Sequence, residues 1–187
     1  MQTPHKIKVV IPVRPSDKEL GDKAAWVHRA RAGMDCHVEV VVDEKLEGWV
    51  KMHNKTFRAS NNAFYVYSCA DYFPGVDWLK IAFEMMQAKS YGLIGFNDGK
   101  WHGGIATVGL VRRSWAENNY DGDLFFSEYH SHFADTEITI LAKEDKAYGY
   151  NPDAVLIEID YNKEGQNISL KDRMLFNKRG YGRGRFG

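Results

Sequence analysis

Apolar strand-like runs alternate with amphipathic segments through the first hundred residues of this chain. Four short apolar runs bounded by polar or turn residues predict strands over Ile7–Val13, Val38–Val42, Ala63–Tyr67 and Tyr91–Phe96. Segments of near-helical periodicity between them predict helices over Asp17–Ala32, Trp49–Ala59 and Val76–Lys89. Strands that alternate with helices pair in parallel through right-handed crossovers. The pattern therefore predicts an α/β fold with a mostly parallel, doubly wound sheet flanked by helices.

A polar residue follows each of the four predicted strands. These residues are Arg14, Asp43, Asp71 and Asp98. In an open α/β sheet the carboxyl ends of parallel strands meet at one edge, and ligands bind in the crevice there. We therefore expect the functional site at this edge.

The second half of the chain has a less regular pattern. It predicts a strand over 103–111, a short helix over 112–118, a turn over 119–123, a helix over 135–146 and a last strand over 154–159. The segment from Asn177 to Gly187 is too rich in glycine to form stable structure alone. We assign residues 1–165 to one compact domain and residues 166–187 to a C-terminal segment with an Arg- and Gly-rich tail.

Length and composition fit a single globular domain. The chain has 187 residues, 44% of them hydrophobic, and its 25 Lys and Arg equal its 25 Asp and Glu, so net charge indicates no polyanionic partner. No apolar run approaches the roughly 18 residues that span a bilayer, and the N-terminus lacks a signal peptide's apolar region. The two cysteines, Cys36 and Cys69, lie in or beside predicted strands, which favours buried thiols and a cytoplasmic location.

The turn after the first predicted strand carries no glycine-rich phosphate motif. Residues Val13–Asp17 match neither the G-x-G-x-x-G pattern nor the Walker pattern, which argues against a dinucleotide dehydrogenase or a P-loop enzyme. A phosphate ligand would therefore need a metal ion and cationic side chains.

The acidic residue Asp71 is the strongest candidate for a metal ligand. It closely follows an apolar run and precedes the turn at Pro74-Gly75. Its hard carboxylate oxygen suits Mg²⁺ or Mn²⁺, which neutralise phosphates. The alternative is a structural role, because Asp before Pro-Gly is also good turn chemistry.

Five motifs in order complete the pattern. They are Val9–Arg14, the strand Val40–Asp43, Asn54 on a helix, Ala70-Asp71 followed by Pro74-Gly75 and Trp78-Leu79, and His132–Glu137. In this order they resemble the glycosyltransferases of the GT-A fold, close to family 2 of that class. The resemblance covers about residues 7 to 160.

The resemblance implies a role for each motif. Pro12, Val13, Arg14, Asp43 and Asn54 would bind the nucleotide of a nucleotide-sugar donor, and Asp43 would accept a ring N–H of a uracil-type base. Asp71 would bind the Mn²⁺ or Mg²⁺ cofactor. Asp135 would be the catalytic base that deprotonates the hydroxyl acceptor, with inversion at the anomeric carbon. The alternative for Asp135 is helix capping.

The chain departs from the family pattern at the metal site. Cys69 stands where the first aspartate of the metal motif is expected, and Leu156–Asp160 replaces the region of a common metal-binding histidine. Asp160 or a histidine of residues 130–132 would complete the ligand set.

Four further residues are candidates for binding the acceptor or the diphosphate: His102, Arg112, His130 and His132. His130 and His132 alternate along the chain, so an extended backbone would place them on one side. Imidazoles bind metals and phosphate oxygens, but loop histidines with ordinary hydrogen bonds are the plain alternative.

Two other function classes remain open. A nucleotidyltransferase would share the carboxylates and the metal without needing Asp135. A catalytically inactive module that binds nucleotide or nucleic acid would explain the reduced metal motif. The tail carries Arg179, Arg183 and Arg185 interleaved with Tyr181 and Phe186, so it would stack on bases, close over the donor as a lid or have no specific role. The acceptor stays open among a small molecule, a glycan, a protein and a modified DNA base.

Overall fold

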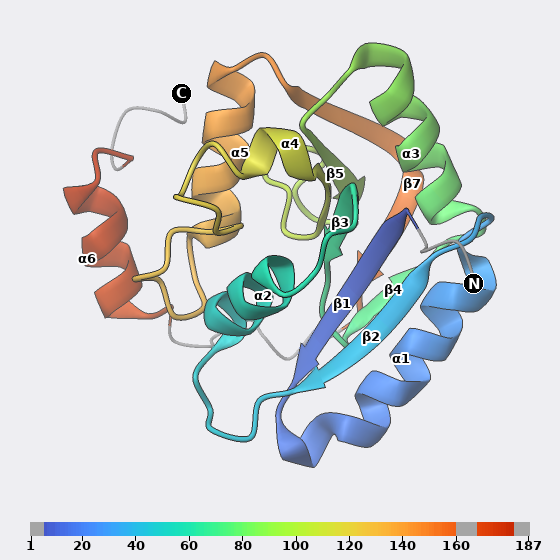
Figure 1. Cartoon of the computed structure of the whole chain (residues 1–187), viewed down its shortest axis with the longest axis horizontal. Helices are drawn as coiled ribbons and strands as arrows, with labels where there is room; N and C mark the ends of the chain where they lie inside the picture. The colour runs from blue at the N-terminus through green and yellow to red at the C-terminus, as the bar shows by residue number, and fades with distance from the viewer. Residues whose placement is uncertain (1–5, 160–167, 182–187) are drawn as a thin grey trace.

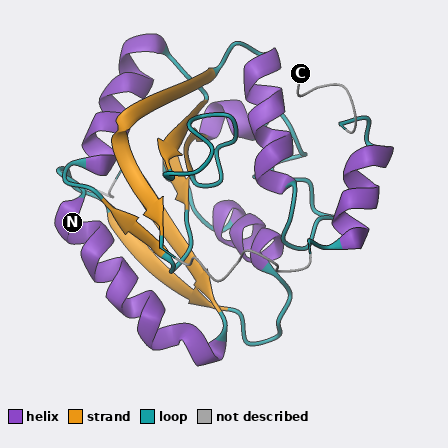
Figure 2. Ribbon diagram, turned by 180° about the vertical axis from the view of Figure 1, so that it is seen from behind, coloured by secondary structure: helices purple, strands orange, loops and turns teal. Residues whose placement is uncertain are grey.

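The computed structural model describes residues 6–159 and 168–181, which form one seven-stranded sheet with helices on both faces (Figures 1 and 2). The strands are β1 Ile7–Val13, β2 His37–Val42, β3 Phe64–Tyr67, β4 Tyr72–Pro74, β5 Leu93–Asn97, β6 Gly109–Arg112 and β7 Tyr148–Glu158. The helices are the 3-10 turn η1 Pro15–Asp17, α1 Lys18–Arg31, α2 Trp49–Arg58, α3 Trp78–Lys89, α4 Arg113–Ala116, α5 Ala134–Glu144 and α6 Leu170–Lys178.

The strand order is β2-β1-β3-β6-β5-β7-β4, and five of the seven strands run in one direction. β1 pairs in parallel with β2 and β3, and β5 pairs in parallel with β7. β6 lies antiparallel between β3 and β5, and β4 is antiparallel to β7. The reversal at β6 has a simple cause, because residues 98–108 contain turns and no crossover helix. The predicted mostly parallel α/β sheet is confirmed.

Two apolar cores lie on opposite faces of the sheet. On one face Val9 and Ile11 of β1 pack in a cluster that includes Trp78 and Ala82 of α3, and α1 lies against the same face. On the other face Val10 joins the cluster built from α2 and α5. Successive side chains of a strand point to opposite faces, so β1 is buried on both sides. This explains its continuous run of Val and Ile.

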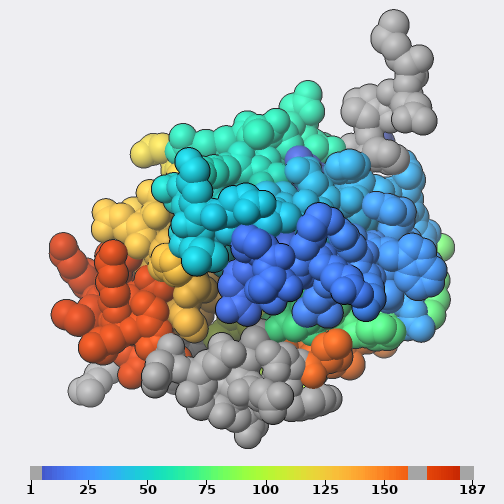
Figure 3. Space-filling view, turned by 90° about the horizontal axis from the view of Figure 1, so that it is seen from below, coloured from blue at the N-terminus to red at the C-terminus, as the bar shows by residue number. Residues whose placement is uncertain are grey.

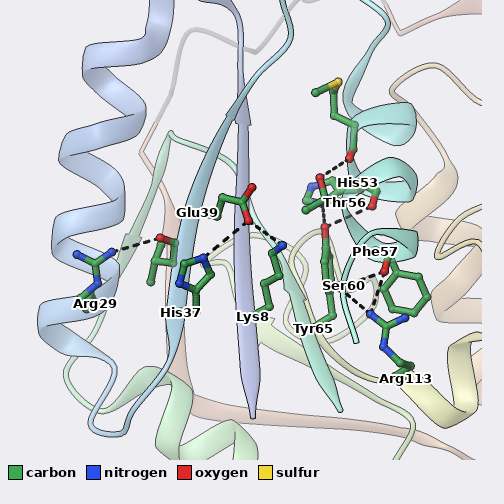
Figure 4. A network of polar contacts seen from close by, with 12 residues as sticks. Lys8, Arg29, His37, Glu39, His53, Thr56, Phe57, Ser60, Tyr65 and Arg113 are labelled. Atoms are coloured by element: carbon green, nitrogen blue, oxygen red, sulfur yellow. Dashed lines mark hydrogen bonds and ion pairs between the residues drawn. The ribbon is translucent and has the colours of Figure 1, made fainter. Parts of the chain in front are cut away.

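Polar contacts fix the strands and the neighbouring helix α2 in register (Figure 4). Lys8 of β1 and Glu39 of β2 form an ion pair at 2.7 Å. The Tyr65 hydroxyl of β3 lies 3.0 Å from Nδ1 of His53 on α2, and both side chains are fully buried. Burial lowers the pKa of His53 to about 3, so the ring stays neutral in the core.

Four elements differ from the sequence prediction. β4 was not predicted, because its three residues include a proline and β7 is its one partner among the described strands. β6 begins at Gly109 rather than at residue 103, and β7 begins at Tyr148 rather than at residue 154. α6 was also not predicted, although its Phe176 is buried in the core beside α5. The predicted domain boundary at 165/166 lies outside the described residues.

Within residues 6–159 and 168–181, every helix is too short or too polar to cross a bilayer.

Candidate functional site

A cleft of about 610 Å³ opens at the carboxyl edge of β1, β2 and β3. Figure 3 looks onto this edge, where the segments after β1 (blue) and β2 (cyan) lie near the loop before α5 (amber) and α6 (red). The lining residues come from segments far apart in the sequence: Pro12, Val13, Arg14, Asp17, Leu20, Asp43, Leu46, Gly48, Trp49, Met52, Cys69, Ala70, Asp71 and His130. The structure thus brings together six of the predicted site residues: Pro12, Val13, Arg14, Asp43, Asp71 and His130.

Asp43 shapes the wall of the cleft beyond β2. Its carboxylate accepts hydrogen bonds from the backbone N–H groups of Glu47 at 2.9 Å and Gly48 at 2.8 Å. These bonds fold residues 43–48 into a loop that leads into α2. A carboxylate has about four acceptor positions, so these two bonds leave Asp43 capacity for a ligand N–H. Its role toward a nucleobase stays a prediction.

Gly48 is required where the loop meets α2. Its φ of 98° lies in a region that favours glycine, and an added Cβ would approach the backbone oxygen of His130 to 2.7 Å. Two carbons of the His130 ring would lie 2.9 Å from the same Cβ. The close approach therefore packs the loop before α5 directly against the loop after β2.

Asp71 lies where the chain passes from β3 to β4. Its backbone carbonyl accepts a hydrogen bond from the Ile159 N–H at 2.9 Å, which holds it beside the end of β7. Cys69 and Ala70 line the cleft with it, so the shortened metal motif faces the same space as Asp43. Asp160, considered above as a further ligand, lies outside the described residues.

Arg14 supplies the guanidinium at the mouth of the cleft. Its side chain is 71% exposed, and its Nε donates to the Asp17 carboxylate at 2.8 Å. Arg14 therefore contributes a positive charge to the lining of the cleft, and a guanidinium is a good partner for an anionic ligand.

Trp49 forms an aromatic wall that the sequence analysis did not assign to the site. Its Nε1 donates to the Ser68 carbonyl at 3.3 Å, and its ring lies 4.9 Å from Phe125 and 5.9 Å from Tyr67. The only sequence signal was the Gly48-Trp49 pair at the start of a helix, where a glycine permits close approach. The ring is fixed before any ligand binds.

Asp135 lies in the first turn of α5, at the same edge of the sheet but outside the lining of the cleft. Its Oδ1 accepts hydrogen bonds from the Thr136 N–H at 2.8 Å and the Thr136 hydroxyl at 3.3 Å. Burial raises the pKa of Asp135 from 3.8 to about 6, the Thr136 hydrogen bonds oppose this, and the charge of Asp98 adds to it. Asp135 is therefore ionised at neutral pH, but it accepts a proton more readily than an ordinary aspartate.

The environment of Asp135 connects it to the cleft. Burial raises the pKa of Tyr67 at the end of β3, and the charge of Asp135 raises it further. The Tyr67 ring in turn packs on Trp49 of the cleft wall. The Thr139 hydroxyl donates to the Asp135 carbonyl at 2.6 Å and accepts from the Ala106 N–H at 3.0 Å. Helix α5 thus holds this carboxylate firmly beside the segment that follows β5.

Glu137 faces away from this edge, into a separate buried network. Its fully buried carboxylate accepts from the hydroxyls of Tyr120 and Tyr129, each at 2.8 Å. It also accepts two hydrogen bonds from Arg179, at 2.8 and 2.9 Å, and this guanidinium stacks on Phe126. Arg179 therefore has a structural partner on α5, and the role of the tail stays open among the alternatives given for it. Arg183, Arg185 and Phe186 lie outside the described residues.

The two histidines before α5 are placed differently. The exposed His130 lines the cleft, whereas His132 does not, and its Nδ1 lies 2.8 Å from the Ser131 hydroxyl. The backbone N–H groups of residues 130–132 all donate to the carboxylate of Asp172 on α6. No local sequence pattern predicts this contact, because 40 residues separate His132 from Asp172.

Three predicted site residues lie elsewhere. The Asn54 side chain donates to the Phe125 carbonyl and accepts from the Phe125 N–H, both at 2.9 Å, so it fastens a loop to α2 rather than lining the cleft. Arg112 ends β6, which is antiparallel, so it lies at the opposite edge of the sheet and donates to the Tyr91 carbonyl at 3.1 Å. We correct both assignments. His102 is exposed on the loop after β5, outside the cleft, and its role stays a prediction.

A divalent cation in the cleft would have to share its ligands between the protein and a bound phosphate group. Among the described residues, no group of three or more His, Cys, Asp or Glu side chains forms a cage for a metal ion. Mg²⁺ in particular is usually bound by one or two carboxylates together with substrate phosphates. Asp71 supplies one carboxylate of this kind in the lining of the cleft, where Arg14 would pair with phosphate oxygens rather than with the cation.

Comparison with known proteins identifies the fold but no close relative. No protein-family model matches the sequence, and no curated protein matches it. The structure is similar to that of the mannosyltransferase PcManGT from Pyrobaculum calidifontis in complex with GDP-Man and Mn²⁺, with a TM-score of 0.63 and 15% identity. The similarity covers 88% of this chain and 59% of that chain.

TarS from S. aureus gives a similar result. A TarS fragment matches with a TM-score of 0.63 and 13% identity, and a complex of that fragment with UDP matches with a TM-score of 0.57 and 14% identity. Each comparison covers 81% of this chain and 59% of the TarS fragment, so the chain spans well under two thirds of these structures. PcManGT and TarS are GT-A-type glycosyltransferases. The chain described here has the GT-A fold.

Proposed function

We propose that the chain is a metal-dependent glycosyltransferase that moves a sugar from a nucleotide-sugar donor, of the UDP type, to a hydroxyl acceptor. The observation that carries the proposal is the cleft of about 610 Å³ at the carboxyl edge of a GT-A sheet, with Asp43 and Asp71 in its lining. A nucleotide sugar carries a base, a diphosphate and a sugar; in the cleft Asp43 suits the base, and Arg14 and Asp71 suit the diphosphate with its cation.

The nucleotide half of the donor would bind between the ends of β1 and β2. Asp43 would accept the ring N–H of a uracil-type base, and Pro12 and Val13 would contact the nucleoside. Arg14 would pair with a phosphate oxygen, since its guanidinium is exposed at the cleft. The likeness to structures bound to GDP-Man and to UDP supports a nucleotide ligand of this class.

Asp71 would hold the cation with the diphosphate of the donor. When bound, Mn²⁺ or Mg²⁺ would neutralise the charge that develops on the departing nucleoside diphosphate. Asp71 would also orient the diphosphate relative to Arg14, because both side chains line the same space.

Asp135 would act as the general base. Its ionised carboxylate would take the proton of the acceptor hydroxyl as that oxygen attacks the anomeric carbon, and the nucleoside diphosphate would leave from the opposite face with inversion. A pKa of about 6 suits this role, because the group is ionised at neutral pH yet basic enough to accept a proton. The hydrogen bonds from Thr136 would keep the carboxylate fixed during the reaction, and the Thr139 hydroxyl would hold the Asp135 backbone carbonyl.

Release of nucleoside diphosphate tests the proposal. The chain is incubated with UDP-sugars and Mn²⁺, and released UDP is measured with and without candidate acceptors. We expect slow UDP release that EDTA abolishes and that Asp71→Asn lowers by about a hundredfold. Asp153→Asn, an exposed acid on β7, serves as the matched control and keeps the wild-type rate. Release of pyrophosphate would instead indicate a nucleotidyltransferase, and binding of UDP without turnover would indicate an inactive binding module.

A further inference from the structure

Helix α6 is fastened to the segment around the start of α5 at both of its ends. At its C-terminal end Arg179 pairs with the buried Glu137 of α5. In the middle the Phe176 ring stacks on Phe133 at 4.9 Å. At its N-terminal end Asp172 binds the loop of residues 130–132. Figure 1 shows α6 beside this segment, and the loop leads directly to the cleft.

Asp172 makes an unusually complete set of hydrogen bonds for one carboxylate. Its Oδ1 accepts from the His130 N–H at 3.1 Å, and its Oδ2 accepts from the Ser131 N–H at 3.1 Å and the His132 N–H at 3.0 Å. The side chain is fully buried, so these donors replace its water. Three successive amides that converge on one anion fix the local backbone.

The fixed loop carries a side chain into the cleft. His130 lines the cleft, its carbonyl accepts from the Val50 N–H at 3.3 Å, and its ring packs against Gly48. Gly48 in turn donates to the Asp43 carboxylate at 2.8 Å. A continuous set of contacts therefore runs from Asp43, the residue proposed to bind the nucleobase, through Gly48 and His130 to Asp172 on α6.

We propose that Asp172 is a positioning residue for donor binding, which holds His130 and the adjoining Gly48 loop in the shape that receives the nucleotide. The inference rests on the proposed function, because it assumes a nucleotide ligand in the cleft. It assigns α6 a part in the site although none of its residues lines the cleft. Arg179 and Phe176 anchor the helix independently, so loss of the Asp172 contacts acts on the loop rather than releasing α6.

The first test compares binding of UDP in the presence of Mn²⁺ by calorimetry. Asp172→Asn keeps the shape of the side chain but replaces one acceptor oxygen with an NH₂ group that faces an amide donor. We expect the Kd for UDP to rise about tenfold, and the KM for a UDP-sugar to rise with it while kcat stays within about twofold. Arg173→Gln, an exposed change on the same helix, is the matched control and leaves both constants unchanged.

A double-mutant cycle separates positioning from a general loss of structure. His130→Ala removes the side chain that Asp172 is proposed to place, so adding Asp172→Asn in that background should weaken UDP binding by less than about threefold. A full tenfold loss in both backgrounds would show that Asp172 does not act through His130. Equal UDP affinity in wild type and Asp172→Asn would overturn the inference and leave the proposed function intact. Failure of the wild type to bind UDP or GDP would overturn both.

Hydrogen exchange of the wild type covers the case in which Asp172→Asn does not fold. Binding of UDP that depends on the loop should slow amide exchange in α6 and in residues 130–132, because the ligand stabilises the arrangement these contacts hold. The amides of α3, on the far side of the sheet, are the internal reference. Unchanged exchange in α6 at saturating UDP would overturn the inference.

Discussion

Two carboxylates on α5, only two residues apart, have opposite surroundings. Among the described residues, the Asp135 carboxylate accepts hydrogen bonds from its own turn, chiefly from Thr136, and burial raises its pKa to about 6. Glu137 is fully buried, and it accepts hydrogen bonds from two tyrosine hydroxyls and from two guanidinium nitrogens of Arg179. Helical geometry places residues two apart on different faces, so one helix presents one acid to the edge of the sheet and the other to α6.

The two carboxylates differ in whether the protein itself supplies their hydrogen-bond donors and a cation. Glu137 has a complete set of donors inside the protein, which is the arrangement expected of a structural group. No cation is among the described groups that shift the pKa of Asp135, and the charged group that does shift it, Asp98, repels it. A buried carboxylate near a cleft, with a raised pKa and no cation among the groups that shift it, is a candidate for a functional role. We therefore expect substitutions of Asp135 to change catalysis and substitutions of Glu137 to change stability.

The largest expected effect is on catalysis. Asp135→Asn keeps the size and the Thr136 hydrogen bond of the side chain but cannot accept the acceptor's proton. We expect kcat for sugar transfer to fall at least about a thousandfold, with the Kd for UDP unchanged. Steady-state transfer assays and calorimetry measure the two quantities. Transfer at the wild-type rate would remove Asp135 from the role of base.

Substitution of Glu137 should instead act on stability. Glu137→Gln places an amide where Arg179 and two hydroxyls donate, which leaves part of the buried network without acceptors. We expect the free energy of unfolding to fall by about 3 kcal/mol in urea titrations, with kcat per folded molecule close to that of the wild type. Glu128→Gln, an exposed acid in the loop before α5, is the control and should change stability by less than about 0.5 kcal/mol. A large loss of kcat in folded Glu137→Gln would abolish the distinction.

The same Asp135→Asn variant should be more stable than the wild type. Because the pKa of Asp135 is raised from 3.8 to about 6, its neutral form stabilises the fold below about pH 4, and this contribution is lost as pH rises through 6. Asparagine stays neutral, so the variant should gain about 2 kcal/mol at about pH 7.5 and under 1 kcal/mol at about pH 4. Urea titrations at the two pH values measure the gain. An equal gain at both would mean that ionisation is not its source.

Much of the fold could be predicted from local pattern. β1 and the start of α2 lie at their predicted residues, because continuous Val and Ile runs and helical periodicity are local signals. β4 has three residues and depends on β7 for its pairing, so its own sequence contains too little information. α6 exposes Leu170 and Met174 and is held by contacts with distant residues, which no periodicity reveals.

The site could also be predicted only as far as local pattern reaches. The placement of Asp43 and Asp71 in one cleft could be predicted, because the ends of parallel strands converge on one edge whatever the details of packing. Arg112 was assigned wrongly, because only pairing reveals that β6 is antiparallel and ends at the far edge. Asn54 was also assigned wrongly, because its partner Phe125 is 71 residues away. Contacts of this kind depend on tertiary structure and leave no mark in the local sequence.

The pH dependence of transfer gives a smaller effect. A base with a pKa of about 6 loses its active form as pH falls, so kcat/KM should drop about tenfold from its plateau to about pH 5. Glu137→Gln should keep the same midpoint, since Glu137 is not the base. Profiles at constant ionic strength measure this. A midpoint near pH 4, which leaves the profile nearly flat from about pH 5 to 8, would argue against a base with the raised pKa of Asp135.

The smallest effect concerns one donor of the Glu137 network. Tyr120→Phe removes a single hydroxyl at 2.8 Å, and Tyr129 and Arg179 still satisfy the carboxylate. We expect a loss of about 1 kcal/mol in urea, well below that of Glu137→Gln, with transfer unchanged. Tyr91→Phe, in the other core, is the control and should cost less than about 0.5 kcal/mol. A cost equal to that of Glu137→Gln would mean that the tyrosine, not the arginine, holds Glu137 in place. The contrast between the two acids would then rest on a neutral hydrogen-bond donor rather than on charge.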